Sequence, residues 1–283
     1  MVDMADRVRL HSFLVEQIVS LNVFSCPVSS VLHHNDLLSG KIEEQSHHSC
    51  GIWSQASYIN HSCIDSAQRA FIGDMMIVRA SRDLEPRTEI TFWYQSPLDS
   101  DAKDLQEKLK FWGFVCDCAL CTDSRATKAA VSTRRQNLRK DLTRAFEDPN
   151  GIMTDKIDRM LAGLKKTYTR PADEVPRLQL WDLQLSLTLA YATQENMIKC
   201  LESARNALLS LGFIVVGADS SSTSFAVVKW GLLTYGVVEL FMHAAGAFRI
   251  MGTKEKARHA EEYAKTAYKI EFGEDTSFGV MHG

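Results

Sequence analysis

Two short segments, YINHSC at residues 58–63 and CDCALC at residues 116–121, decide the fold of this 283-residue chain. The second segment has the spacing C-x-C-x2-C, and the first ends in Cys63, which lies 53 positions (116 − 63) upstream of the cluster. Thiolates bind zinc tetrahedrally, and a structural zinc site fills all four positions. The thiols therefore predict one Zn2+ site that ties two remote segments together, with the ligands Cys63, Cys116, Cys118 and Cys121.

A redox role for these thiols stays open as an alternative. In that interpretation Cys63 is a small buried hydrophobic residue, and Cys118 and Cys121 form a redox-active pair. The C-x2-C spacing alone fits such a pair, but the strand–helix context of thioredoxin-like motifs does not accompany it in this sequence. Zinc is the interpretation we prefer.

The remaining cysteines lie outside this cluster. Cys26, Cys50 and Cys200 are expected to be core or free thiols. Two His-His pairs, at residues 33–34 and 47–48, are close in sequence to Cys26 and Cys50 and could complete a second metal site. Histidines of a polar loop are the simpler interpretation of these pairs.

Composition places the chain among ordinary globular proteins. Hydrophobic residues make up 45% and charged residues 24% of the chain, and the formal net charge is −3. Because there is no basic excess, nucleic acid is not expected as a direct partner. The sequence says nothing about the oligomeric state.

No segment is expected to enter a membrane or to direct secretion. The most apolar window, residues 225–248, carries Lys229, Glu239 and His243, and each would be costly at the centre of a bilayer. The N-terminus has no charged region followed by an apolar core, as a signal peptide would. We therefore expect an intracellular protein, nuclear or cytoplasmic, with neither a membrane partner nor disulfides.

The order of the patterns predicts an α+β fold. Residues 5–21 have a helical stripe, and residues 25–51 are expected to form a loop or a short helix with loops. Strands are expected at 69–72 and 75–80, joined by a tight turn at Gly73, and at 90–94. A helix carrying Leu105 and Leu109 follows, which leads into the cysteine cluster. The predicted divisions are 1–50 (helical segment and loop), 51–98 (β-rich core), 99–124 (zinc region) and 125–283 (helical domain).

The second half of the chain has a helical pattern throughout. Antiparallel helix pairs with short connections are typical of an α-hairpin array. Small residues between 226 and 271 have the spacing of a tetratricopeptide-like pair, although the full signature of that repeat is not clear. The predicted helices are 129–147, 153–168, 177–193, 196–211, 224–248 and 254–271.

Three features together resemble the SET-domain protein-lysine methyltransferases. They are the run NHSC at residues 60–63, the strand that ends at Tyr94, and the segment FVCDCALC at residues 114–121. The subgroup they are most similar to is the SET and MYND family with its fungal SET-plus-tetratricopeptide relatives. The resemblance covers about residues 10–122 and implies S-adenosylmethionine as the cofactor. It also implies a lysine-containing protein or peptide, histone or non-histone, as the substrate.

The resemblance assigns roles to single residues. Asn60 and His61 correspond to the pair that contacts S-adenosylmethionine, and Tyr94 corresponds to the catalytic tyrosine. Methyl transfer needs in-line approach of a neutral amine, which a tyrosine hydroxyl in an aromatic channel can hold. Cys63 corresponds to a ligand of the zinc site whose other cysteines follow the SET domain in sequence. The other cofactor contacts that the resemblance implies are Asn22, Trp112 and Phe114.

The sequence departs from the family pattern at two points, and these departures leave open an alternative to an active methyltransferase. The chain contains no Gly-x-Gly, the family's loop around the methionine end of the cofactor, and Cys63 is followed by Ile64-Asp65-Ser66 where the family has x-Pro-Asn. We expect the first SET strands and a MYND module to be missing, with side chains of Asp65 and Ser66 forming the turn. The alternative is a catalytically inactive scaffold that binds a peptide or helix through its helical domain.

Overall fold

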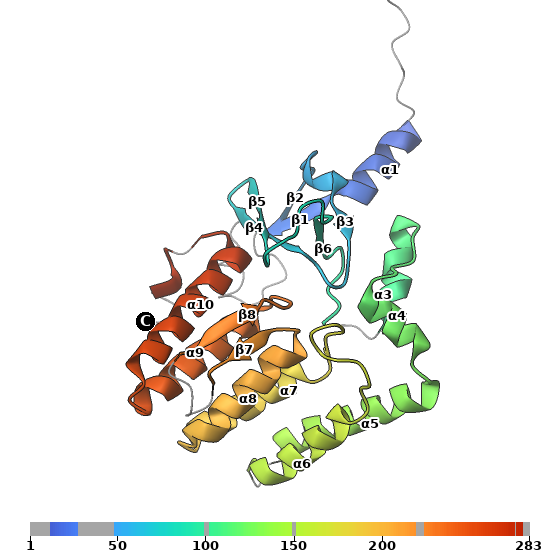
Figure 1. Cartoon of the computed structure of the whole chain (residues 1–283). Coiled ribbons are helices and arrows are strands. Elements are labelled where there is room, and N and C mark those ends of the chain that lie inside the picture. Colours follow the sequence, from blue (N-terminus) through green and yellow to red (C-terminus); the bar gives the residue numbers. More distant parts are fainter. Residues whose placement is uncertain are drawn as a thin grey trace, which may run out of the picture.

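The computed structural model of the chain has a β-rich N-terminal part beside an array of antiparallel helices (Figure 1). It describes residues 12–27, 48–98, 102–148, 151–218, 224–274 and 276–279. The α+β class expected from the sequence is confirmed. The start of the first predicted helix and the histidines at 33, 34 and 47 lie outside the described residues.

The β-rich part is built from short strand pairs. In antiparallel pairs, β1 lies against β2 and β4 against β5, whereas β3 runs parallel to β6. The strand bounds are β1 (Phe24–Pro27), β2 (His48–Gly51), β3 (Asn60–His61), β4 (Ala67–Ile72), β5 (Met75–Ala80) and β6 (Thr91–Phe92).

The predicted hairpin is confirmed, whereas the predicted strand at 90–94 is shorter than expected. Gly73 has a φ of +61°, which residues with a side chain rarely adopt, and it forms the turn between β4 and β5. β6 ends at Phe92 because the backbone N–H of Tyr94 donates to the ring of His61 and not to a neighbouring strand. Residues 25–51, expected as a loop, contribute most of β1 and all of β2.

Ser66 joins the hairpin to β6. Its hydroxyl donates to Glu89 O at 3.1 Å and accepts from Thr91 N at 2.9 Å, and its own N–H donates to Thr91 O at 3.0 Å. Ser81 N donates to Ser66 O at 2.9 Å on the other side. The side-chain bonds of Ser66 therefore run to residues 89 and 91 and do not close the turn after Cys63, contrary to expectation. Asp65 does make a local side-chain bond, accepting from Gln68 Nε2 at 2.5 Å.

The helices follow the predicted order. The helix predicted at 177–193 begins at Trp181, and the one predicted at 153–168 ends at Lys165. The helix bounds are α1 (Ser12–Asn22), α3 (Ala102–Leu109), α4 (Ala119–Ala126), α5 (Ala129–Phe146), α6 (Thr154–Lys165), α7 (Trp181–Thr193), α8 (Met197–Ser210), α9 (Tyr235–Ile250) and α10 (Lys254–Phe272), with 3-10 turns η1 (Ala56–Tyr58) and η2 (Lys110–Trp112). No helix within the described ranges is long and apolar enough to cross a bilayer.

The helix predicted at 224–248 is wrong in its first part. Residues Ala226–Lys229 form the strand β8, which pairs antiparallel with β7 (Ile214–Val216), and α9 begins only at Tyr235. Both strands are rich in valine, whose branched side chain favours extended backbone, and Thr234 caps α9 by accepting from Gly236 N. Hydrophobic periodicity alone did not separate this short hairpin from the helix that follows.

Two buried clusters hold the parts together. The larger fills the space among the helices and includes Phe213, Phe241 and Tyr268. α10 packs on β4, where Arg79 Nη1 donates to Gly273 O at 2.8 Å, so the end of the helical array is attached to the hairpin. The smaller cluster surrounds the cysteines. Division of the chain at the predicted boundaries stays a prediction.

Gly231 is expected to be essential for the β7–β8 junction. A Cβ at this position would lie 2.3 Å from Leu211 O and 2.6 Å from Phe213 N, both backbone atoms that cannot move independently. We expect Gly231→Ala to lower the free energy of unfolding by about 2 kcal/mol or more. Urea denaturation followed by circular dichroism measures this change.

Gly246 provides the matched control. It lies inside α9, and a Cβ there meets no atom within 4 Å. Gly246→Ala is therefore expected to raise stability by about 0.5–1 kcal/mol, since alanine is the better helix former. Equal effects of the two substitutions would contradict the close approach at Gly231.

Candidate active site and zinc centre

The four predicted zinc ligands converge. The sulfur atoms of Cys63, Cys116, Cys118 and Cys121 all lie within 4.8 Å of one another. Cys63 Sγ is 3.8 Å from Cys116 Sγ and 3.4 Å from Cys121 Sγ. A tetrahedral zinc ion with bonds of about 2.3 Å separates its sulfur ligands by about 3.8 Å, so the donor set and its spacing are compatible with zinc.

Local structure explains how the cluster assembles. Cys118 precedes the first residue of α4 and Cys121 lies in its first turn, so the helix start gathers the downstream thiols. Cys63, Cys116 and Cys121 are buried and pack against Leu105 and Leu109 of α3. The predicted helix at these leucines therefore forms the apolar wall of the thiol cluster.

Gln106 and Arg125 hold the cluster from outside, and sequence reasoning did not identify either. Gln106 Nε2 donates to Cys121 Sγ at 3.5 Å, and its Oε1 accepts from Cys116 N at 3.3 Å. Arg125 Nη1 donates to Cys116 O at 2.7 Å. Such donors orient metal ligands and offset thiolate charge. Their proximity in sequence to the C-x-C-x2-C segment was the available signal.

His61 links the thiol cluster to Tyr94. The backbone N–H of Tyr94 donates to His61 Nδ1 at 3.0 Å, and His61 Nε2 lies 3.3 Å from Cys63 Sγ. Because a backbone N–H can only donate, Nδ1 is the acceptor, and the neutral ring carries its proton on Nε2. Nε2 is therefore the donor to the Cys63 sulfur. The side chain of His61 is engaged on both sides and is a structural bridge.

Tyr94 lies at the centre of a ring of aromatic side chains. The centroid of its ring is 5.2 Å from Trp112, 6.2 Å from Phe114 and 5.6 Å from His61. Its hydroxyl donates to Ile59 O at 2.9 Å, which leaves the oxygen available as an acceptor. Burial raises the pKa of Tyr94 above its ordinary value, so the hydroxyl stays protonated at neutral pH.

The asparagines predicted to contact the cofactor are bonded within the chain. Asn60 Nδ2 donates to Glu89 Oε1 at 2.7 Å, and Asn22 Nδ2 donates to Ile18 O at 2.8 Å. Both side-chain oxygens remain as potential acceptors. Trp112 Nε1 donates to Leu21 O at 3.1 Å, which attaches α1 to the aromatic group.

A cavity of about 250 Å³ opens beside Tyr94. Asn22 and Trp112 also line the cavity, so the structure brings these two predicted residues together with Tyr94. Phe114 is not among the lining residues but contacts the ring of Tyr94. Arg69, which the sequence gave no reason to select, is a further lining residue.

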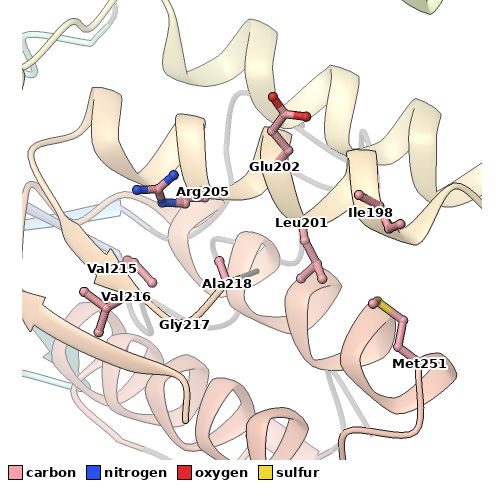
Figure 2. Close-up of a pocket in the computed structure, with 9 residues that line it drawn as sticks. All are labelled: Ile198, Leu201, Glu202, Arg205, Val215, Val216, Gly217, Ala218 and Met251. Carbon is pink, nitrogen blue, oxygen red and sulfur yellow. The ribbon is translucent and has the colours of Figure 1, made fainter. Parts of the chain in front are cut away.

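A larger cavity, of about 420 Å³, lies in the helical array between α8, β7 and the end of α9 (Figure 2). Leu201, Val215 and Met251 give it an apolar lining. Its charged lining residues, Glu202 and Arg205, both come from α8, and the carboxylate of Glu202 points away from Met251 (Figure 2). No set of titratable groups converges there, so the candidate active site is the smaller cavity at Tyr94.

Several known proteins are similar to this chain in sequence. Residues 14–95 match the family model described as SET domain. A protein of Gibberella zeae named "Methyltransferase" is 33% identical over 274 residues, which cover 93% of this chain and 38% of that protein. Human "Histone-lysine N-methyltransferase SMYD3" is 22% identical over 165 residues, covering 58% of this chain and 35% of the relative.

A shorter match has higher identity than the match to human SMYD3. Chicken "N-lysine methyltransferase SMYD2" is 30% identical over 96 residues, covering 34% of this chain and 22% of that protein. The chain thus spans less than two fifths of the length of each of these relatives. Residues 14–95 thus match a SET domain, and the chain is related in sequence to proteins named as SMYD lysine methyltransferases.

Proposed function

We propose that this chain acts as an S-adenosylmethionine-dependent protein-lysine N-methyltransferase, with Tyr94 as the catalytic residue. The observation that carries the proposal is the position of Tyr94. Its ring lines a cavity and is surrounded by aromatic rings, and its hydroxyl proton is committed to Ile59 O. The relatives named as lysine methyltransferases support the same reaction. No observation favours the scaffold alternative.

The side chains around Tyr94 fit the proposed cofactor. Trp112 and Phe114 present flat apolar rings of the kind on which an adenine stacks. The further proposed cofactor contacts are Asn60, Asn22 and His61. The two asparagines would make theirs through their side-chain oxygens. When bound, S-adenosylmethionine supplies a methyl group on a positively charged sulfur.

Tyr94 is proposed to hold the substrate amine. Because its hydroxyl donates to Ile59 O, its oxygen can accept a hydrogen bond from the amine N–H. Tyr94 would thereby hold the amine with its lone pair free to form the new N–C bond to the methyl group that S-adenosylmethionine would supply. The surplus proton on nitrogen would leave to solvent. The aromatic walls exclude water and fix the line of approach.

The proposed substrate is a lysine within a protein, histone or non-histone, and the proposed location is the nucleus or the cytoplasm. The name of human SMYD3 specifies histone lysine, whereas that of SMYD2 specifies lysine alone. The cavity beside Tyr94 has room for a side chain and not for a folded domain, so a lysine on an accessible segment is the expected form of the substrate.

The reaction is tested by incubating the chain with labelled S-adenosylmethionine and candidate proteins, followed by mass spectrometry of the methylated lysines. We expect Tyr94→Phe to lower the rate of methyl transfer by about 10²- to 10³-fold, because it removes the oriented oxygen at the reacting centre.

Tyr58→Phe is the matched control for Tyr94→Phe. Tyr58 is 87% exposed and loses only a solvated hydroxyl. Its rate is expected to equal that of the parent. Equal rates for the parent and Tyr94→Phe would contradict the role of this tyrosine, and absence of any methylated lysine would contradict the reaction itself.

We also propose a structural zinc ion at the four thiols. Metal analysis of the purified chain is expected to find about one zinc ion per chain. Cys118→Ser should release most of it and lower the melting temperature, since binding of a structural metal contributes directly to folding. Cys50→Ser is the control, because Cys50 is exposed and lies outside the cluster. Full zinc content in Cys118→Ser would contradict this ligand set.

A further inference from the structure

The cavity beside Tyr94 carries a single charge. Among its lining residues in the described part of the chain, Arg69 of β4 is the only one with a charged side chain. The others are apolar, aromatic or neutral polar, and none is acidic. A positive charge is unexpected in the wall of a cavity that is proposed to receive a lysine side chain beside the cofactor, because lysine is itself positive at neutral pH.

The guanidinium of Arg69 is fixed in place by neutral groups. Nη1 donates to Trp93 O, and the guanidinium carbon lies 4.8 Å from the ring centroid of Phe92 and 5.6 Å from that of Phe24. These contacts orient the group but supply no negative charge.

Arg69 has no ion-pair partner within the part of the chain that the structure describes. Among the described residues no carboxylate lies within ion-pair distance of it. The titratable groups that interact with it electrostatically are Asp65 and Tyr94. Asp65 also faces Arg82, and one of its oxygens is occupied by Gln68. Burial lowers the pKa of Arg69 to about 10, so the guanidinium is still charged at neutral pH.

The charge of Arg69 reaches Tyr94. It lowers the pKa of this tyrosine, against the opposite effect of burial. The guanidinium and the tyrosine ring line the same small cavity, and charges partly withdrawn from solvent interact more strongly than in bulk water. An amine bonded to the Tyr94 oxygen would lie in the same field.

We propose that Arg69 is a specificity-determining residue that admits the substrate amine to this cavity in its neutral form. The inference rests on the proposed methyl transfer. A lysine ammonium brought to Tyr94 is repelled by the guanidinium and loses its proton to solvent, whereas the neutral amine is not repelled. The lone pair needed for the new N–C bond is thereby freed. The positively charged methylated product is repelled in turn, which favours its release.

The pH dependence of kcat tests this role, because kcat reports protonation in the substrate complex. Removing the charge in Arg69→Met should raise the apparent pKa of the bound amine by about one unit. The acidic limb of the profile then moves to higher pH. Below this limb kcat falls about tenfold relative to the parent, and the profiles of the two proteins converge at high pH.

Two variants separate charge from structure. Arg69→Lys keeps a positive charge, so the acidic limb of its kcat profile should lie at the same pH as in the parent. Arg79→Met removes an arginine that also donates to a backbone carbonyl, Gly273 O, but does not line the cavity. It is expected to leave the limb unmoved. A limb that moves equally in Arg79→Met and Arg69→Met would overturn the assignment.

A measurement without turnover gives an independent result. The pKa of Tyr94, followed by NMR of 13C-labelled tyrosine, should rise by about one unit in Arg69→Met and not in Arg69→Lys. An unmoved Tyr94 pKa or an unmoved kcat limb in an active Arg69→Met variant overturns the inference. Weaker binding of S-adenosylmethionine with an unmoved limb overturns it too and assigns Arg69 to the cofactor carboxylate.

Failure of the proposed function has a different signature. If the parent methylates no lysine while the Tyr94 pKa responds to Arg69→Met, the methyl transfer is wrong and amine selection falls with it, although the field at Tyr94 is real. If the parent is active and neither the limb nor the Tyr94 pKa responds, methyl transfer stands and only the role of Arg69 is lost.

Discussion

The contacts of Cys63 set the geometry of the candidate site. Its sulfur belongs to the thiol cluster and accepts from His61 Nε2, while its carbonyl accepts from Trp93 Nε1 at 3.1 Å. Through His61, the cluster fixes the backbone N–H of Tyr94. The position of the proposed catalytic tyrosine therefore depends on a cysteine 31 residues away (94 − 63) and on the segment at 116–121. The thiol cluster, which lies outside the cavity, thus controls the position of Tyr94, which lines it.

The strands themselves give little independent support. β3 and β6 have two residues each, too few for a stable pair, and the larger β4–β5 hairpin is marginal by itself. Ser66 joins the hairpin to β6, and α10 supports the hairpin from the other side through the contact of Arg79 with Gly273 O. The candidate site is consequently held between the thiol cluster and the helical array, which explains why so short a sheet can position a tyrosine.

Local signals in the sequence predicted the parts of the fold that depend on local physics. The hairpin at Gly73 and the order of the helices follow from turn chemistry and hydrophobic periodicity. The β7–β8 hairpin was missed because its short valine-rich strands adjoin a strongly helical segment. The bridging role of His61 and the placement of Arg69 could not be predicted, since both depend on which remote backbone groups, those of Tyr94 and Trp93, the fold brings within hydrogen-bond distance.

Arg69 also poses an energetic question that packing alone does not answer. Withdrawing a guanidinium from water costs several kcal/mol, and a neighbouring acid usually offsets part of that cost. Arg69 has one hydrogen bond and two aromatic contacts, which together contribute about 2–4 kcal/mol, and no ion pair among the described residues. A methionine of similar length would fill the same space without losing hydration. Stability therefore gives no reason for a charge at this position, whereas a cavity that must distinguish an amine from its ammonium does.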